Sequence, residues 1–126
     1  MAEPFQAECV VPILRVENIQ ESFRYYTEKL LFAKKWDWGD PPDFGAVGVG
    51  RVEIFFCEQG QGCPGVWMSI FLDDVNAYHA KIAETGAKIV MEPRDMPWGV
   101  REMHVQDPDG HVIRFSQGLG ESEPHA

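Results

Sequence analysis

Basic residues are scarce in this sequence. Its 126 residues include 11 Lys and Arg against 20 Asp and Glu, which gives a formal charge of −9 at pH 7. Nucleic acids and anionic membrane surfaces both recruit clusters of Lys and Arg. The charge balance therefore excludes both as partners, whereas it suits the attraction of a cationic small ligand.

Long apolar runs are also absent. No stretch approaches the roughly 20 apolar residues that a spanning helix needs. Residues 1–6 lack the basic and then apolar pattern of a signal peptide. We expect a cytoplasmic protein.

Cysteine is rare and is not arranged for pairing. Cys9, Cys57 and Cys63 are odd in number and lack zinc-type spacing, so the sequence predicts neither a disulfide framework nor a structural metal site. We expect free thiols that act as small, partly buried hydrophobic residues.

The first half of the chain predicts a strand, a helix and three more strands. Residues 9–16 form an apolar run whose Pro12 favours an edge or exchanged position. Asn18 and Glu21 form a capping box at the start of a helix with an apolar stripe. Strands are expected at about 33–38, 46–49 and 52–57.

The second half repeats this order after a Gly- and Pro-rich stretch at 59–65. A strand is expected at 66–72, a helix capped by Asp73 or Asp74, and strands at 88–91, 101–106 and 111–117. The offset between Val16 and Leu72 is 56 residues. We therefore predict one α+β domain of two βαβββ modules, with module 1 at about 8–58, a linker at about 59–65, module 2 at about 66–117 and a tail at 118–126.

Strand alternation predicts which side chains turn away from the helices. On the strand near 101–106 these are Glu102, His104 and Gln106, and on the strand near 66–72 they are Trp67, Ser69 and Phe71. A row of inward polar groups calls for a wet ligand cavity or a partner.

Two charged residues are placed on the same side by the same rule. Glu53 belongs there because an unpaired carboxylate beneath a helix is costly, although the consecutive Ile54, Phe55 and Phe56 leave the register open. Arg114 alternates with Ile113 and Phe115. With Glu102 and His104, these residues can also form a polar network that binds no ligand.

Aromatic and histidine side chains each have a structural alternative. The large aromatic residues can belong to a core or a dimer interface rather than a ligand site; they are Trp36, Trp38, Phe44 and Trp98. The remaining histidines, His79, His111 and His125, are expected to face solvent.

Residues 97–111 and 23–32, together with the duplicated βαβββ order, resemble the glyoxalase, bleomycin resistance protein and extradiol dioxygenase superfamily, also called vicinal oxygen chelate. Metal-dependent members of that family place His, Gln or Glu on the first and last strands of each module. Carried over to this chain, those positions are Val11, Glu53 (or Ile54), Trp67 and Arg114. The resemblance therefore implies no metal and no cofactor. We hypothesise that Arg114 instead pairs with Glu53 across the cavity where a metal would lie.

Within that family the chain is most similar to the bleomycin resistance proteins, which bind their drug without a metal. The similar segments are 11–14, Trp36, 43–47, Trp67, and 97–99 with 101–102. The resemblance implies a homodimer that exchanges its first strand and binds ligands in clefts between subunits. Trp36, Phe44, Trp67 and Trp98 match positions near the planar part of the drug.

The sequence thus predicts a metal-independent protein that sequesters a cationic, planar-aromatic small molecule. Its ligand-binding residues are Trp36, Phe44, Glu53, Trp67, Trp98, Glu102, His104 and Arg114. One alternative is a glyoxalase-like lyase or isomerase with Glu102 or His104 as general base. Another is a binder of an endogenous aromatic metabolite.

Overall fold

The computed structural model describes residues 5–120 and shows one succession of elements twice. The first module comprises β1 (Ile13–Val16), α1 (Ile19–Arg24), a π-helical segment η1 (Tyr25–Lys29), β2 (Ala33–Gly39), β3 (Pro42–Val49) and β4 (Val52–Glu58). The second comprises β5 (Trp67–Phe71), α2 (Val75–Ile82), β6 (Lys88–Asp95), β7 (Val100–Gln106) and β8 (Val112–Gly118). The predicted α+β fold of two βαβββ modules is confirmed.

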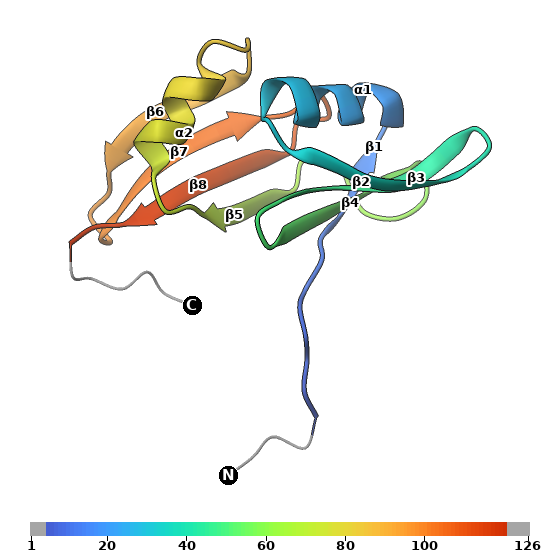
Figure 1. Cartoon of the computed structure of the whole chain (residues 1–126), viewed down its shortest axis with the longest axis horizontal. Helices are drawn as coiled ribbons and strands as arrows, with labels where there is room; N and C mark the ends of the chain where they lie inside the picture. The colour runs from blue at the N-terminus through green and yellow to red at the C-terminus, as the bar shows by residue number, and fades with distance from the viewer. Residues whose placement is uncertain (1–4, 121–126) are drawn as a thin grey trace.

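Each module forms its own four-stranded sheet. Sheet A has the order β1-β4-β3-β2 and sheet B the order β5-β8-β7-β6, with the first strand of each parallel to the last. The sheets lie side by side and both helices cover the same side of the molecule (Figure 1). The face of each sheet opposite its helix is called the open face below.

Both helices begin in the same way. Asn18 accepts a hydrogen bond from the Glu21 amide, and Asp74 accepts one from the Ala77 amide, so Asp74 is the cap rather than Asp73. A side chain from the last strand of each module adds a second acceptor. Glu58 binds the Ile19 amide and Gln117 binds the Val75 amide, which ties each helix to its sheet.

Three strands differ from the sequence-based expectation by four residues each, and the others by no more than two. The first begins at Ile13 rather than residue 9, since Pro12 has no amide to donate to a ladder. The third begins at Pro42 rather than 46, because it pairs with β2 as far as Gly39. The sixth continues to Asp95 rather than 91, past Pro93.

The outer edge strands are irregular. On β2 the pairing with β3 shifts between Lys34 and Trp36. On β6 it shifts on both sides of Met91, and Pro93 removes an amide from the strand. Neither edge offers a regular ladder to a further strand.

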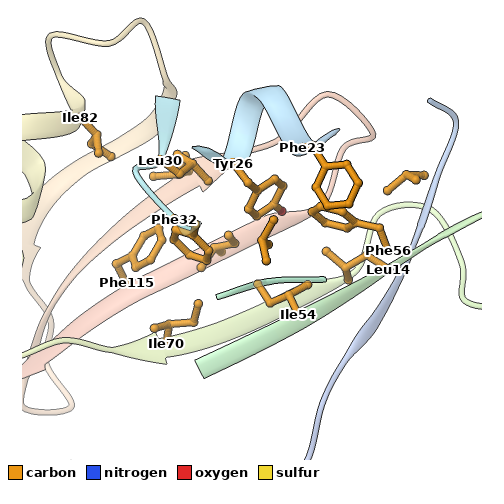
Figure 2. Close-up of a cluster of buried hydrophobic side chains, with 14 of the residues drawn as sticks. Leu14, Phe23, Tyr26, Leu30, Phe32, Ile54, Phe56, Ile70, Ile82 and Phe115 are labelled. Atoms are coloured by element: carbon orange, nitrogen blue, oxygen red, sulfur yellow. The ribbon is translucent and has the colours of Figure 1, made fainter. Parts of the chain in front are cut away.

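One hydrophobic core runs beneath both helices (Figure 2). Tyr26 lies at its centre, with its ring 5.0 Å from Phe56 and 5.5 Å from Phe32. Phe32 in turn lies 6.5 Å from Phe115 of the second module. The two modules therefore share one core.

A buried polar joint also holds the modules together. The Tyr26 hydroxyl donates to Asp107 Oδ2 at 2.7 Å, and Asp107 Oδ1 accepts from the amides of Asp109 and His111 at 2.9 and 3.0 Å. Burial raises the pKa of Asp107, although these hydrogen bonds oppose the shift. The turn before β8 is thus fixed to the first module's helix.

His111 completes this joint, and the expectation that it faces solvent is wrong. Its side chain is fully buried, with Nδ1 accepting from the Val66 amide at 2.9 Å and Nε2 2.8 Å from the Arg15 carbonyl. Because Nδ1 accepts, Nε2 carries the proton and donates to Arg15. Both partners of His111 are backbone groups far away in the chain, so the sequence beside the turn gives no sign that this side chain is buried.

The other two histidines have different outcomes. His79 is partly exposed and lies 2.7 Å from Glu92 across α2 and β6. His125 lies outside the described residues. The cysteines at 9, 57 and 63 are free as expected, but only Cys57 is partly buried, and Cys9 and Cys63 are exposed. Among residues 5–120 no helix is long and apolar enough to cross a membrane.

The substitution Tyr26→Phe tests the hydrogen bond between Tyr26 and Asp107. Removing the hydroxyl leaves a buried Asp107 oxygen without its donor, which we expect to lower the free energy of unfolding by about 1–3 kcal/mol. The loss should shrink at low pH, because the pKa of Asp107 rises further without this hydrogen bond and the protonated acid needs no donor. Urea denaturation at several pH values measures both effects.

Tyr78→Phe is the control, since the Tyr78 hydroxyl donates to the neutral Leu30 carbonyl at 2.7 Å. Its loss should be smaller and independent of pH in the acidic range. Equal losses in the two variants would contradict the importance of the Asp107 carboxylate.

A second prediction concerns Leu31, whose φ of 65° is unfavourable for a residue with a Cβ atom. Leu31→Gly should raise the free energy of unfolding by up to about 1 kcal/mol, because glycine adopts this conformation freely. Leu31→Ala keeps the Cβ atom and should bring no gain. A thermal melt that ranks alanine above glycine would refute the strain argument.

Candidate functional site

The open faces carry the residues that the sequence places in a site. On β4, Ile54 and Phe56 are fully buried beneath the helix, so Glu53 and Phe55 point to the other side. On β8, Ile113 and Phe115 are buried and Arg114 points away from the helix in the same manner. The register is thereby settled, with Glu53 on the open face and Ile54 in the core.

The open face of sheet A carries an aromatic cluster of Trp36, Phe44 and Phe55, which come from β2, β3 and β4. The Trp36 ring lies 5.1 Å from Phe55 and 5.6 Å from Phe44, and Phe44 lies 5.6 Å from Phe55. Trp38, further along β2, is 71% exposed. The sequence missed Phe55 because Ile54, Phe55 and Phe56 are consecutive and show no alternation.

Two cavities adjoin this face. One of about 450 Å³ is lined by Trp38, Asp43, Phe44 and Cys57 among others. Another of about 420 Å³ lies between the segment before β1, β4 and β5, and its lining includes Val11, Glu53 and Ser69. Carboxylates of Asp43 and Glu53 thus accompany apolar walls that can take a flat ligand.

The open face of sheet B carries a polar cluster of Trp98, Glu102, His104 and Arg114. Glu102 is 2% exposed and lies at its centre. Its Oε1 accepts from Arg114 Nη2 at 2.9 Å and from Trp98 Nε1 at 3.3 Å, while its Oε2 lies 2.7 Å from His104 Nε2. Strands β7 and β8 bring three of the four residues together, because His104 is paired with Arg114 and Glu102 lies one pair further along the same face.

These contacts set the charge of Glu102. Burial acts to raise its pKa, but the hydrogen bond with His104, the positive charge of Arg114 and the hydrogen bonds from Trp98 and Arg114 together outweigh burial. The pKa of Glu102 is therefore below its ordinary value, and the carboxylate is ionised at neutral pH. Its charge balances that of Arg114.

The pairing predicted for Arg114 is wrong within one chain. Arg114 binds Glu102, its neighbour across the β7 and β8 ladder, rather than Glu53 on the other sheet. The alternation of each strand gave the correct face but could not tell which acidic residue on that side lies nearest.

Further aromatic groups border the polar cluster. Trp67 on β5 is 59% exposed, and its ring meets the His104 ring edge-on at 5.4 Å. Trp98 is 51% exposed although its indole nitrogen is bound. Gln106 lies on the same face, with its amide 3.5 Å from the Gly110 carbonyl, and does not join the polar cluster.

The donor set on these faces does not suit a metal. In the part of the chain that the structure describes, no group of three or more His, Cys, Asp or Glu converges as ligands. Protein metal sites in enzymes usually offer about three such ligands. The open faces instead combine ring stacking on sheet A with directed hydrogen bonds on sheet B.

Comparison with known proteins identifies the same architecture. Residues 7–115 match the family model described as Glyoxalase/Bleomycin resistance protein/Dioxygenase superfamily. No curated protein matches the sequence.

Several solved structures share the fold at low sequence identity. TioX from Micromonospora sp. ML1 superposes with a TM-score of 0.78 at 20% identity, covering 90% of this chain and 100% of its own. The bleomycin-binding protein from bleomycin-producing Streptomyces verticillus, complexed with copper(II)-bleomycin, superposes with a TM-score of 0.73 at 23% identity. The match covers 93% of this chain and 99% of the other. A virulence protein from Salmonella typhimurium superposes with a TM-score of 0.72 at 23% identity, and the match covers 91% of this chain and 99% of the other.

The lowered pKa of Glu102 predicts a pH-dependent contribution to stability. A carboxylate whose pKa falls on folding stabilises the protein above its ordinary pKa of 4.5, and this contribution is lost as the pH falls through the lowered value. Glu102→Gln should therefore lower the free energy of unfolding by about 1–3 kcal/mol near neutrality. The difference from the wild type should shrink below about pH 4.

Glu92→Gln is the matched control, because Glu92 pairs with His79 at the same 2.7 Å distance but is mostly exposed. Denaturant titrations from neutral to acidic pH compare the two variants. A loss at Glu102 that stays constant over this range would show that its charge adds no stability.

Proposed function

The chain belongs to the Glyoxalase/Bleomycin resistance protein/Dioxygenase superfamily, and from this premise we propose that it is a metal-independent small-molecule-binding protein. In this proposal a homodimer sequesters a cationic, planar-aromatic ligand in clefts between its subunits. The aromatic cluster carries the proposal, because it presents three touching rings on a face that no helix covers.

Aromatic exposure on the open faces supports the dimer. Trp38, Trp67, Phe71 and Trp98 are each 46% exposed or more, and large exposed apolar patches mark interaction surfaces. A second copy facing the first would cover both open faces and turn them into enclosed clefts. Exchange of the segment before β1 between subunits is part of this proposal, as that segment extends away from the body (Figure 1).

Charge supports a cationic ligand. The one guanidinium in the polar cluster is already balanced by Glu102, so it does not repel a cation on its own. Asp43 and Glu58 line one neighbouring cavity, whereas Glu53 shares the lining of the other with Arg51, and the chain carries −9 overall. Flat cations are also attracted by the faces of Trp rings.

Metal independence is supported by the side chains at the positions that metal-dependent relatives use. Of Val11, Glu53, Trp67 and Arg114, only Glu53 can donate a lone pair to an ion. The residues present do not fit a metal, so no step of the proposed function passes through one.

A second candidate is a lyase or isomerase of glyoxalase type, and one contact favours a particular base. Glu102 is engaged by three partners and has a lowered pKa, which makes it a poor proton acceptor. His104 is oriented by Glu102 and borders the open face, so His104 is the base in this alternative. The polar cluster offers Arg114 as the cationic group beside it.

Titration with metal-free bleomycin in the presence of a chelator tests the main proposal. All four tryptophans lie on or beside the open faces, so we expect saturable quenching of tryptophan fluorescence at micromolar ligand. Binding should weaken as salt rises, because the charge attraction is screened. Trp36→Ala should weaken it by about tenfold or more through loss of ring stacking.

Leu31→Ala is the control, since it removes a side chain of similar exposure from the end of the first helix. If bleomycin binds only when the chelator is left out, the proposed metal independence is wrong. Absence of quenching by bleomycin, together with quenching by smaller aromatic amines, would assign the cleft to an endogenous aromatic metabolite. Quenching by none of them would reject the proposal.

A further inference from the structure

The hydrogen-bond roles inside the polar cluster are fixed by Glu102. Both donors from Trp98 and Arg114 converge on Oε1, and Oε2 faces His104 Nε2 at 2.7 Å. A carboxylate has no proton to give, so His104 Nε2 must donate. In the neutral form of His104 this is the ring's one proton, so Nδ1 has a lone pair that can accept a hydrogen bond.

Arg114 lies opposite His104 in the sheet. His104 and Arg114 are direct partners across the β7 and β8 ladder, and both lie on the open face. Only Nη2 of Arg114 is used by Glu102. Within residues 5–120, the buried side-chain nitrogen and oxygen atoms without a partner are Arg114 Nε and Ser116 Oγ, both on this face of β8.

We propose that His104 and Arg114 together recognise an amide edge, meaning a primary carboxamide or an equivalent edge of a heteroaromatic ring. The carbonyl oxygen accepts from the Arg114 guanidinium and the N–H donates to His104 Nδ1. This inference rests on the proposed binding function and names the polar group that the ligand presents to sheet B.

Other head groups match the pair less well. A carboxylate would bring a second acceptor against the His104 lone pair and a second negative charge near Glu102. An ester offers no donor to His104, and an ammonium group offers no acceptor to Arg114. The edge-on ring of Trp67 at 5.4 Å from His104 provides an apolar wall for the aromatic part of such a ligand.

A series of naphthalene compounds tests the inference on the unaltered protein. Naphthamide, methyl naphthoate, naphthoate and naphthylmethylammonium share one ring system and differ in the head group. We expect naphthamide to bind about tenfold more tightly than the ester and the carboxylate, because it makes both hydrogen bonds. Tryptophan fluorescence and a competition assay give the four affinities.

The outcomes separate this inference from the proposed function. Equal binding of all four compounds, or a preference for the ester, carboxylate or ammonium over the amide, overturns the amide-edge inference while aromatic capture stands. Binding of none of the four overturns the amide-edge inference, and the bleomycin titration decides the proposed function separately.

The substitution Glu102→Gln should reverse the preference of the site for naphthamide over naphthoate. Trp98 and Arg114 both donate to Oε1, so the glutamine oxygen stays on their side and its NH₂ group faces His104. His104 Nε2 must then accept, and the proton moves to Nδ1. The pair now offers two donors, and we expect naphthoate to become the tighter ligand by about tenfold.

Nitrogen NMR of the histidine rings reads the tautomer without any ligand. The wild type should show a protonated Nε2 and a bare Nδ1 at His104, and the variant should show the opposite. Glu92→Gln changes the similar His79 pair on the other side of the sheet and should alter neither the His104 signals nor the order of affinities. A protonated Nδ1 in the neutral ring of the wild type, or an unchanged preference in Glu102→Gln, overturns the inference.

Discussion

The arrangement of this molecule depends on the hydrogen bond between the Tyr26 hydroxyl and the buried carboxylate of Asp107. It joins the first module's helix to the turn before β8, and His111 extends the joint to the backbone of both modules. Because this contact and the shared core fix the sheets side by side, both open faces lie on one side of the molecule (Figure 1). In the proposed dimer, a ligand or a second copy therefore meets both at once.

The two open faces offer different chemistry to a ligand. Sheet A presents aromatic rings, which bind flat molecules through area and dispersion and tolerate many shapes. Sheet B presents the polar cluster, where three donors surround one buried carboxylate. Burying a charge is unfavourable without such partners, so the same contacts that stabilise Glu102 also hold Trp98, His104 and Arg114 in fixed orientations. In the proposed function, selectivity arises from this geometry, which is set before a ligand arrives.

Much of this could be predicted from the sequence because the deciding signals are local. The repeated order of strand and helix, the cap at Asn18 and the outward face of Arg114 follow from periodicity and capping chemistry. The partner of Arg114 and the burial of His111 depend on which strands are neighbours and on backbone groups far away in the chain. Phe55 was missed because a run of three apolar residues has no alternation to interpret.

The irregular outer strands have a consequence for solubility. A protein that exposes tryptophans on an open sheet face risks growth of that sheet into fibres, which proceeds by adding strands at an edge. Here the register shift beside Lys34 on β2 and the shifts and Pro93 on β6 interrupt the ladders at those edges. In the proposed dimer, association takes place at the faces and closes after one partner, whereas growth at the β2 and β6 edges would have no natural end.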